Sequence, residues 1–275
     1  MPGWPLRRRR AGAGSDPGGR WPDRDRLMNG PAVARRWREL ASPVGPHPLD
    51  GLITPERAWN YRQVLARRTG RLVVVVEDCH DPHNATAIIR TCDAFGLHTV
   101  MVITGHNSFK VNRKISQGSH HYIDLRHHTD VATAYAELRA AGYRILATDL
   151  AAGAVTSART LSAELARQPL ALVFGNEGCG VSAEASQLAD GQVLIPMSGF
   201  PQSLNLSVSV TALVYGLRAD ALGEDQPGDL GAETQHVWYD RWVRNYLGEV
   251  RAERFARAIG RNDEDLDVLA AGGVA

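Results

Sequence analysis

The chain has 275 residues, with 31 lysines and arginines against 30 aspartates and glutamates. This length is sufficient for one ordinary domain with a buried core and some appendages, and the near-neutral charge indicates no particular class of partner. The cysteines Cys79, Cys92 and Cys179 are too few for a disulfide framework, and their odd number fits a reducing compartment. No stretch approaches the roughly 20 apolar residues that span a bilayer. We therefore expect a cytoplasmic protein.

Residues 1–50 differ in composition from the rest of the chain. They are rich in glycine and proline and contain ten arginines, including the run Arg7–Arg10, and five acidic residues. This start lacks the apolar segment of a secretory signal, and its acidic residues argue against an organellar transit peptide. Few apolar positions recur with a helix or strand period. We expect a largely disordered basic tail of a kind that helps to hold RNA.

The first regular element is expected near residue 54. Thr54, Pro55 and Glu56 combine a hydroxyl cap, a proline in the first turn and an acid near the positive helix end, which predicts a helix from there to Gly70. Short apolar runs then alternate with helical segments. The predicted strands are Leu72–Val76, Thr99–Ile103, Tyr122–Leu125, Tyr143–Thr148, Leu170–Phe174 and Gln192–Ile195, and the predicted helices are Asn84–Phe95, a segment from Val131 to Gly142, and one from about Asn205. This alternation predicts an α/β domain with a mostly parallel sheet over residues 51–222.

Residues 223–275 are expected to hold a linker and C-terminal helices. The stretch 221–232 is polar and glycine-rich, and residues 233–259 are predicted to form one or two helices. Trp238, Trp242 and Tyr246 are spaced four apart with arginines between them. This pattern fits either a helix that stacks on bases and contacts phosphates, or an amphipathic helix that packs on the body or on a second chain. We favour the packing interpretation.

The first of three informative motifs reads Asn-Ala-Thr-Ala-Ile-Ile-Arg-Thr-Cys-Asp-Ala-Phe-Gly over residues 84–96. Asn84 follows the turn Asp81–His83, so it is a natural helix cap as well as a candidate site residue. Arg90 follows two isoleucines in a helix that we expect to be buried. A buried arginine requires a carboxylate or phosphate partner, so the pattern favours a functional role for Arg90.

The second motif, residues 172–182, leaves an apolar strand and enters a glycine-rich turn. The glycines allow the backbone to approach a ligand closely, and Ser182 can cap the next helix. Their order differs from the dinucleotide-binding fingerprint, and a phosphate-binding P-loop is absent. Taken alone, Glu177 is typical of a solvated loop acid.

The third motif, residues 195–209, follows the last predicted strand and begins Ile-Pro-Met-Ser-Gly. Proline and glycine predict an irregular loop with free backbone groups, which suits a ligand. Ser203 and Asn205 come next, just before a helix. Taken alone, both residues are of the type that caps helices.

Together the three motifs resemble those of the SpoU/TrmH family of RNA ribose 2'-O-methyltransferases, over about residues 54–220. The resemblance implies a SPOUT-type α/β fold with a C-terminal trefoil knot and terminal helical extensions. It also implies S-adenosylmethionine as the cofactor and a homodimer whose active site draws on both chains. No general rule predicts a knot, so that expectation depends on the resemblance alone.

The same resemblance assigns roles to individual residues. The implied catalytic residues are Arg90, as the main one, with Asn84, Glu177, Ser203 and Asn205. The positions implied to hold the cofactor through their backbone are Thr148, Gly175, Ile195, Met197 and Leu204.

The sequence of the first motif is most similar to those of the family branch that methylates guanosine 18 in the tRNA D-loop. Branches that act on rRNA usually carry a globular RNA-binding domain first, which residues 1–50 are too short and irregular to form. Another tRNA position or rRNA remains the alternative substrate. A non-catalytic RNA-binding relative is the alternative of another class, and the intact polar set argues against it. The histidine pairs at 120–121 and 127–128 lack suitable partner ligands, so we expect no metal.

Overall fold

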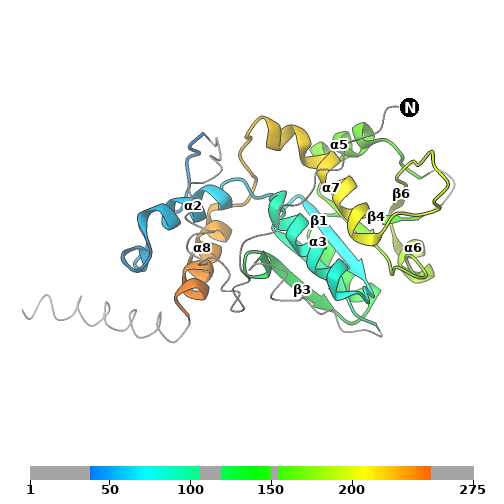
Figure 1. Cartoon of the computed structure of the whole chain (residues 1–275), viewed down its shortest axis with the longest axis horizontal. Coiled ribbons are helices and arrows are strands. Elements are labelled where there is room, and N and C mark those ends of the chain that lie inside the picture. Colours follow the sequence, from blue (N-terminus) through cyan, green and yellow to red (C-terminus); the bar gives the residue numbers. More distant parts are fainter. Residues whose placement is uncertain (1–37, 106–118, 150–153, 249–275) are drawn as a thin grey trace, which may run out of the picture. The chain divides into compact units, whose positions relative to one another are not determined.

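The computed structural model describes residues 38–105, 119–149 and 154–248. In these ranges six strands form one sheet in the order β3-β2-β1-β5-β4-β6, and every neighbouring pair is parallel (Figure 1). The strands are β1 (Leu72–Glu77), β2 (Thr99–Ile103), β3 (Asp124–His128), β4 (Arg144–Thr148), β5 (Leu170–Phe174) and β6 (Gly191–Val193). The predicted α/β fold with a parallel sheet is confirmed. The strands β2 and β5 have the predicted bounds, whereas β3 begins two residues later and β6 ends two residues earlier than predicted.

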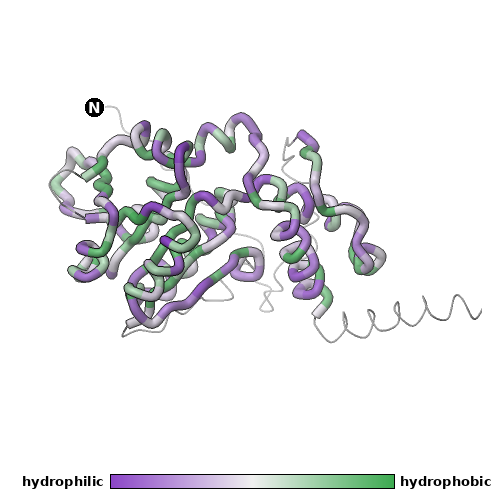
Figure 2. The backbone as a smooth tube through the Cα atoms, turned by 180° about the vertical axis from the view of Figure 1, so that it is seen from behind, coloured by the Kyte–Doolittle hydropathy of each residue, from purple (hydrophilic) through white to green (hydrophobic). Residues whose placement is uncertain are grey.

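Helices cover both faces of the sheet. The central strands β1 and β5 are buried along their whole length, as expected for apolar runs in a parallel sheet, and Figure 2 shows hydrophobic residues along the strands. Because side chains alternate along a strand, Val74 and Val76 face α3, α5 and α7, while Val73 and Val75 face α4 and α6. These helices are α3 (Pro82–Ala94), α4 (Val131–Ala140), α5 (Ala158–Arg167), α6 (Ala183–Leu188) and α7 (Leu206–Gly223). The result is a three-layer sandwich.

Helix α2 (Pro55–Leu65) begins where the sequence predicts. Oγ1 of Thr54 accepts a hydrogen bond from the backbone N–H of Arg57 at 3.2 Å, so the predicted cap is confirmed. The segment before it is folded, since Val44 and Leu49 are buried against α2. The part of the predicted disordered tail from residue 38 onward is therefore ordered. Residues 1–37 lie outside the described residues, as does the predicted helical segment beyond residue 248.

Helix α2 ends five residues before its predicted stop at Gly70. The carbonyl oxygen of Arg68 instead accepts a hydrogen bond from the backbone N–H of Asp229 at 3.1 Å. The carboxylate of Asp229 accepts from Gly70 N–H at 2.7 Å, and Arg67 donates twice to the carboxylate of Asp225, at 2.6 and 2.9 Å. The predicted polar linker after α7 is thus held tightly against the end of α2.

Helix α8 (Ala232–Leu247) packs on α2 in a third hydrophobic core, separate from the two that lie on either face of the sheet. Trp238 and Trp242 are only 6% and 1% exposed, and the ring of Trp242 meets Tyr61 of α2 edge to face, with centroids 5.6 Å apart. The packing interpretation is confirmed for these two tryptophans. Among the helices of the described residues, none combines the length and apolar character that crossing a bilayer requires.

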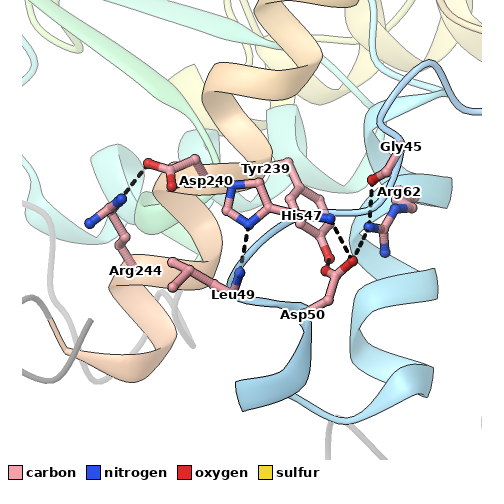
Figure 3. Close-up of polar contacts among 8 residues, drawn as sticks. All are labelled: Gly45, His47, Leu49, Asp50, Arg62, Tyr239, Asp240 and Arg244. Carbon is pink, nitrogen blue, oxygen red and sulfur yellow. Dashed lines mark hydrogen bonds and ion pairs between the residues drawn. The ribbon is translucent and has the colours of Figure 1, made fainter. Parts of the chain in front are cut away.

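Polar contacts fasten this third core at one edge (Figure 3). Asp50 accepts a hydrogen bond from Arg62 at 2.5 Å and another from the hydroxyl of Tyr239. Nε2 of His47 lies 3.3 Å from a carboxylate oxygen of Asp240. These contacts join residues that are far apart in sequence. The segment before α2, α2 itself and α8 are therefore packed together as one unit.

Candidate active site

The loops after neighbouring strands bring the predicted site residues to one edge of the sheet. Asn84 lies in α3, which follows β1, and Glu177 follows β5, the neighbour of β1 in the sheet. On one side of this pair the order continues to β2, and on the other to β4, so the strand order changes direction here. Parallel α/β sheets bind ligands at the carboxyl ends of their strands at such points.

Three side chains, one from each motif, are joined by hydrogen bonds. Nδ2 of Asn84 donates to Oε1 of Glu177 at 2.9 Å, and Oδ1 of Asn84 accepts from Nδ2 of Asn205 at 3.1 Å. Oδ1 of Asn205 in turn accepts from the backbone N–H groups of Ser207 and Val208, at 2.9 and 3.3 Å. The start of α7 therefore fixes Asn205, which fixes Asn84, which orients the carboxylate of Glu177.

The two asparagines differ in their relation to the helix ends. Oδ1 of Asp81 accepts from the backbone N–H of His83 at 2.8 Å and α3 begins at Pro82, so Asp81 is the cap and the prediction for Asn84 was wrong. Asn84 is 6% exposed and lies in the first turn, with its side chain directed across to the loop after β5. Asn205 is the cap of α7, as predicted, and also part of the site.

Three donors surround the carboxylate of Glu177. Besides Asn84, the thiol of Cys79 donates to Oε1 at 3.4 Å and the backbone N–H of His80 donates to Oε2 at 3.3 Å. Partial burial acts to raise the pKa of Glu177, but these hydrogen bonds, that of Asn84 foremost, lower it below the ordinary value. Glu177 is therefore ionised at neutral pH. Burial and the neighbouring Glu177 charge raise the pKa of the Cys79 thiol to about 12, so the thiol stays protonated and donates.

Cys79 and His80 are site residues that the sequence analysis missed. The two follow β1 directly, so they reach the same sheet edge as the loop after β5. They were not predicted because they match no metal-binding or catalytic pattern. Their position at the carboxyl end of a central strand was the available signal.

The glycine-rich turn after β5 presents Glu177. Asn176 and Gly180 exchange two backbone hydrogen bonds of 2.9 Å, and Nδ2 of Asn176 donates to the carbonyl oxygen of Asp78 at 2.8 Å. A Cβ atom on Gly175 would lie 2.0 Å from the carbonyl group of Gly180, so only glycine fits there without displacing the turn. At Gly175 the absence of a side chain is required by backbone packing within the motif itself.

Arg90 lies outside this network. It is exposed, so the prediction that it is buried was wrong. The buried face of α3 contains Ala85, Ile88, Ile89 and Cys92, which share one side of the helix. Arg90 points away from that face, and six residues beyond Asn84 correspond to about 9 Å along the axis and about 120° around it. A single chain therefore presents Arg90 and Asn84 on different sides of α3.

The remaining predicted residues lie in loops at the same edge. Ser203 is exposed in the loop that precedes Asn205. The predicted cofactor positions lie at the end of β4, after β5, after β6 and before α7; they are Thr148, Gly175, Ile195, Met197 and Leu204. Since β5, β4 and β6 are adjacent and parallel, these positions share one edge of the sheet. The side chains of Met197 and Leu204 are 38% and 37% exposed.

Comparison with protein families matches residues 71–215 to the SpoU rRNA Methylase family. This segment contains all three motifs and the hydrogen bonds that join them. The chain belongs to this family. This SpoU-family chain is similar to the tRNA (guanosine(18)-2'-O)-methyltransferase of Thermus thermophilus, with 38% identity over 162 residues that cover 59% of the chain and 81% of the relative.

The enzyme of the same name from Escherichia coli is 36% identical to the SpoU-family chain over 163 residues, which cover 59% of the chain and 69% of that enzyme. Among solved structures, the TrmH/SpoU tRNA modifying enzyme of A. aeolicus superposes with a TM-score of 0.62 at 30% identity. This match covers 70% of the chain and 97% of the solved chain. The family assignment predicted from the three motifs is confirmed, and the chain is accordingly a methyltransferase.

Proposed function

We propose that this SpoU-family methyltransferase transfers a methyl group from S-adenosylmethionine to the ribose 2'-hydroxyl of guanosine 18 in tRNA. The names of its relatives in Thermus thermophilus and Escherichia coli support this substrate. The observation that carries the proposal is the hydrogen-bonded set of Asn84, Glu177 and Asn205, which unites the three motifs at the edge of the sheet. A protein that only bound RNA would have no need to hold a carboxylate in one orientation there.

The loops after β4, β5 and β6 fit S-adenosylmethionine. Residues 196–205 are all exposed, which leaves room for a ligand along this loop. The partly exposed Met197 and Leu204 add apolar surface of the kind that an adenine ring requires. The proposed backbone ligands of the cofactor are Thr148, Gly175, Ile195, Met197 and Leu204. When bound, S-adenosylmethionine supplies an electrophilic methyl group.

The polar side chains hold and orient the ribose. The ionised carboxylate of Glu177 accepts a hydrogen bond from a ribose hydroxyl, and Asn84 and Asn205 prevent that carboxylate from rotating. Ser203, exposed two residues before Asn205, contacts the same sugar. The guanidinium of Arg90 binds the adjacent phosphate, orients the 2'-hydroxyl and stabilises the negative charge that develops on its oxygen.

We include a homodimer in the proposal, in which a second chain supplies Arg90 to this site. Arg90 and Asn84 lie on different sides of α3, which supports a site made from two chains. Helix α7 also has an apolar stripe of Val208, Tyr215 and Leu222, spaced seven apart and 49%, 56% and 37% exposed, which is suited to a helix–helix contact. The knotted path of the segments after β5 and β6 is also part of the proposal and rests on family membership.

The proposal is tested by incubating the purified chain with labelled S-adenosylmethionine and unmodified tRNA, and mapping the 2'-O-methyl group. We expect methylation at guanosine 18 that is lost in Arg90→Ala and strongly reduced in Arg90→Lys, because lysine lacks the planar guanidinium fork. An Arg90→Lys variant that retained most of its turnover would refute the essential guanidinium. Transfer to rRNA alone would overturn the substrate, and transfer to neither RNA would favour the non-catalytic relative.

Mixing two inactive variants tests the shared site. If Arg90 and Glu177 of one site come from different chains, a mixed dimer of Arg90→Ala and Glu177→Gln chains retains one site with both native residues. Half of the dimers in an equal mixture are mixed, so we expect about a quarter of the wild-type activity. Dimers that exchange chains and remain inactive would show that both residues act within one chain.

A further inference from the structure

Phe200 has the largest exposed fraction among the large hydrophobic side chains of the described residues, at 106%. It lies in the middle of the exposed loop 196–205, between β6 and α7. A whole phenyl ring in water is unfavourable, because aromatic rings contribute most when they are buried. A ring so exposed requires a partner that covers it when the protein acts.

The backbone holds Phe200 at the outside of a sharp bend. A Cβ atom on Gly199 would lie 3.3 Å from Cδ of Pro201, so the residues on either side of Phe200 approach each other closely. Pro201 fixes its own φ and restricts the conformation of the residue before it, which is Phe200. The bend at Gly199 and Phe200, restricted on one side by Pro201, thus leaves the ring exposed.

The neighbours of Phe200 fit a nucleobase better than a protein surface. Of the six residues within three positions of Phe200, four are small or polar, namely Ser198, Gly199, Gln202 and Ser203, and the other two, Met197 and Pro201, are apolar. The core of a protein interface surrounds a phenylalanine with further apolar side chains. An exposed aromatic ring among hydroxyl and amide groups is typical of RNA-binding sites, where unpaired bases stack on such rings.

The distance along the chain brings Phe200 within reach of the site. It precedes Ser203 by three residues and Asn205 by five, so their Cα atoms lie at most about 11 and 18 Å away. Asn205 is hydrogen-bonded through Asn84 to Glu177, where the target ribose is proposed to lie. We propose that Phe200 stacks on the base of the nucleotide whose ribose is methylated.

This inference rests on the proposed function, since it requires RNA at the Glu177 site. Every base has a π-face, so stacking on Phe200 strengthens RNA binding and holds the nucleotide without selecting guanine. It adds a substrate-binding residue to the polar groups that hold the sugar. The choice of guanosine is then left to other contacts.

Three substitutions separate stacking from apolar packing. Phe200→Ala removes the ring and its bulk, Phe200→Leu keeps apolar bulk without a ring, and Phe200→Tyr keeps the ring. We expect the KM for tRNA to rise about tenfold or more in the alanine and leucine variants, since the loss of one base–aromatic stack lowers affinity about 5- to 150-fold. The tyrosine variant should stay within about twofold of wild type, and the KM for S-adenosylmethionine should be unchanged in all three.

Several outcomes would overturn the inference. A Phe200→Leu variant with the wild-type KM for tRNA would show that the ring is not needed. A rise in the KM for S-adenosylmethionine alone would assign Phe200 to the cofactor, and dissociation of the dimer in sedimentation would assign it to the partner chain. Wild-type transfer to guanosine 18 reports separately on the proposed function. If wild type binds tRNA without transfer, the Kd for tRNA across the same variants still decides the role of Phe200.

Discussion

Asn84→Asp keeps the shape of the side chain at the centre of the site and replaces its donor by a carboxylate oxygen. In the structure that donor, Nδ2, lies 2.9 Å from Oε1 of Glu177. The substitution therefore turns a hydrogen bond to a charged group into a contact between two anions. Losing such a hydrogen bond costs about 1.5–3 kcal/mol, and water screening at the exposed Glu177 reduces this. We expect the free energy of unfolding to fall by about 1–2 kcal/mol at pH 7.

Urea unfolding at several pH values measures this effect. In the wild-type protein the pKa of Glu177 is lowered, so its hydrogen bonds stabilise the fold above the unfolded-state pKa of about 4.3, and this contribution is lost as the pH falls through the lower folded pKa. In Asn84→Asp, repulsion between the two carboxylates raises the pKa of the pair. The deficit in stability should shrink as the pH falls toward about 5, because one carboxyl group then takes up a proton.

A second substitution reverses the polarity of the contact. In Asn84→Asp/Glu177→Gln the amide at position 177 can donate to the carboxylate at position 84, so most of the lost stability should return. Methyl transfer should not return, because the carboxylate at position 177 is gone. The hydrogen bond between Asn84 and Glu177 is refuted if Asn84→Asp unfolds at the same urea concentration as wild type at pH 7. This hydrogen bond is also refuted if the double variant is no more stable than the sum of the two single-variant changes in unfolding free energy predicts.

Two further predictions concern packing and titration. Gly175→Ala should lower the free energy of unfolding by about 4 kcal/mol or more, because its Cβ would lie 2.0 Å from the Gly180 carbonyl. Gly51→Ala, with open space around it, should change the thermal midpoint little. Equal midpoints for the two variants would refute the close approach. Burial, together with the charge of Arg68, lowers the pKa of His98 to about 4. The contribution of the neutral imidazole to stability, about 3 kcal/mol, is therefore complete above pH 6.5 and is lost as the pH falls toward 4. His98→Phe should flatten that part of the stability curve, and an unchanged slope would contradict the burial.

The strands and several helices could be predicted because their signals are local. The β2 and β5 strands are continuous apolar runs, and the buried residues of α4 recur at helical spacing. The end of α2 could not be predicted, because it depends on Asp229, which is 159 positions away from Gly70 in the sequence. Helix α5 was not predicted either. Although Ser157 makes no capping hydrogen bond, Leu161 and Leu165 pack in the core four positions apart among good helix formers, so the local signal was present and was missed.

The candidate site, likewise, could be predicted from the sequence only in part. The motifs identified Asn84, Glu177 and Asn205, but neither spacing nor composition could show that their side chains are linked in that order. Arg90 was expected to be buried because it follows two buried isoleucines. Neighbours in a helix point about 100° apart, so burial of Ile89 says little about the next residue.

The third core unites the two ends of the described chain, which has a consequence for synthesis on the ribosome. Tyr239 and Asp50, which are hydrogen-bonded, stand 189 positions apart. At about 5–20 residues per second, roughly 10–40 s separate their synthesis. All six described strands of the sheet are made within that interval. Until α8 emerges, the apolar side of α2 is covered only in part, by Val44 and Leu49, and the surface that Trp242 later covers stays exposed on the nascent chain.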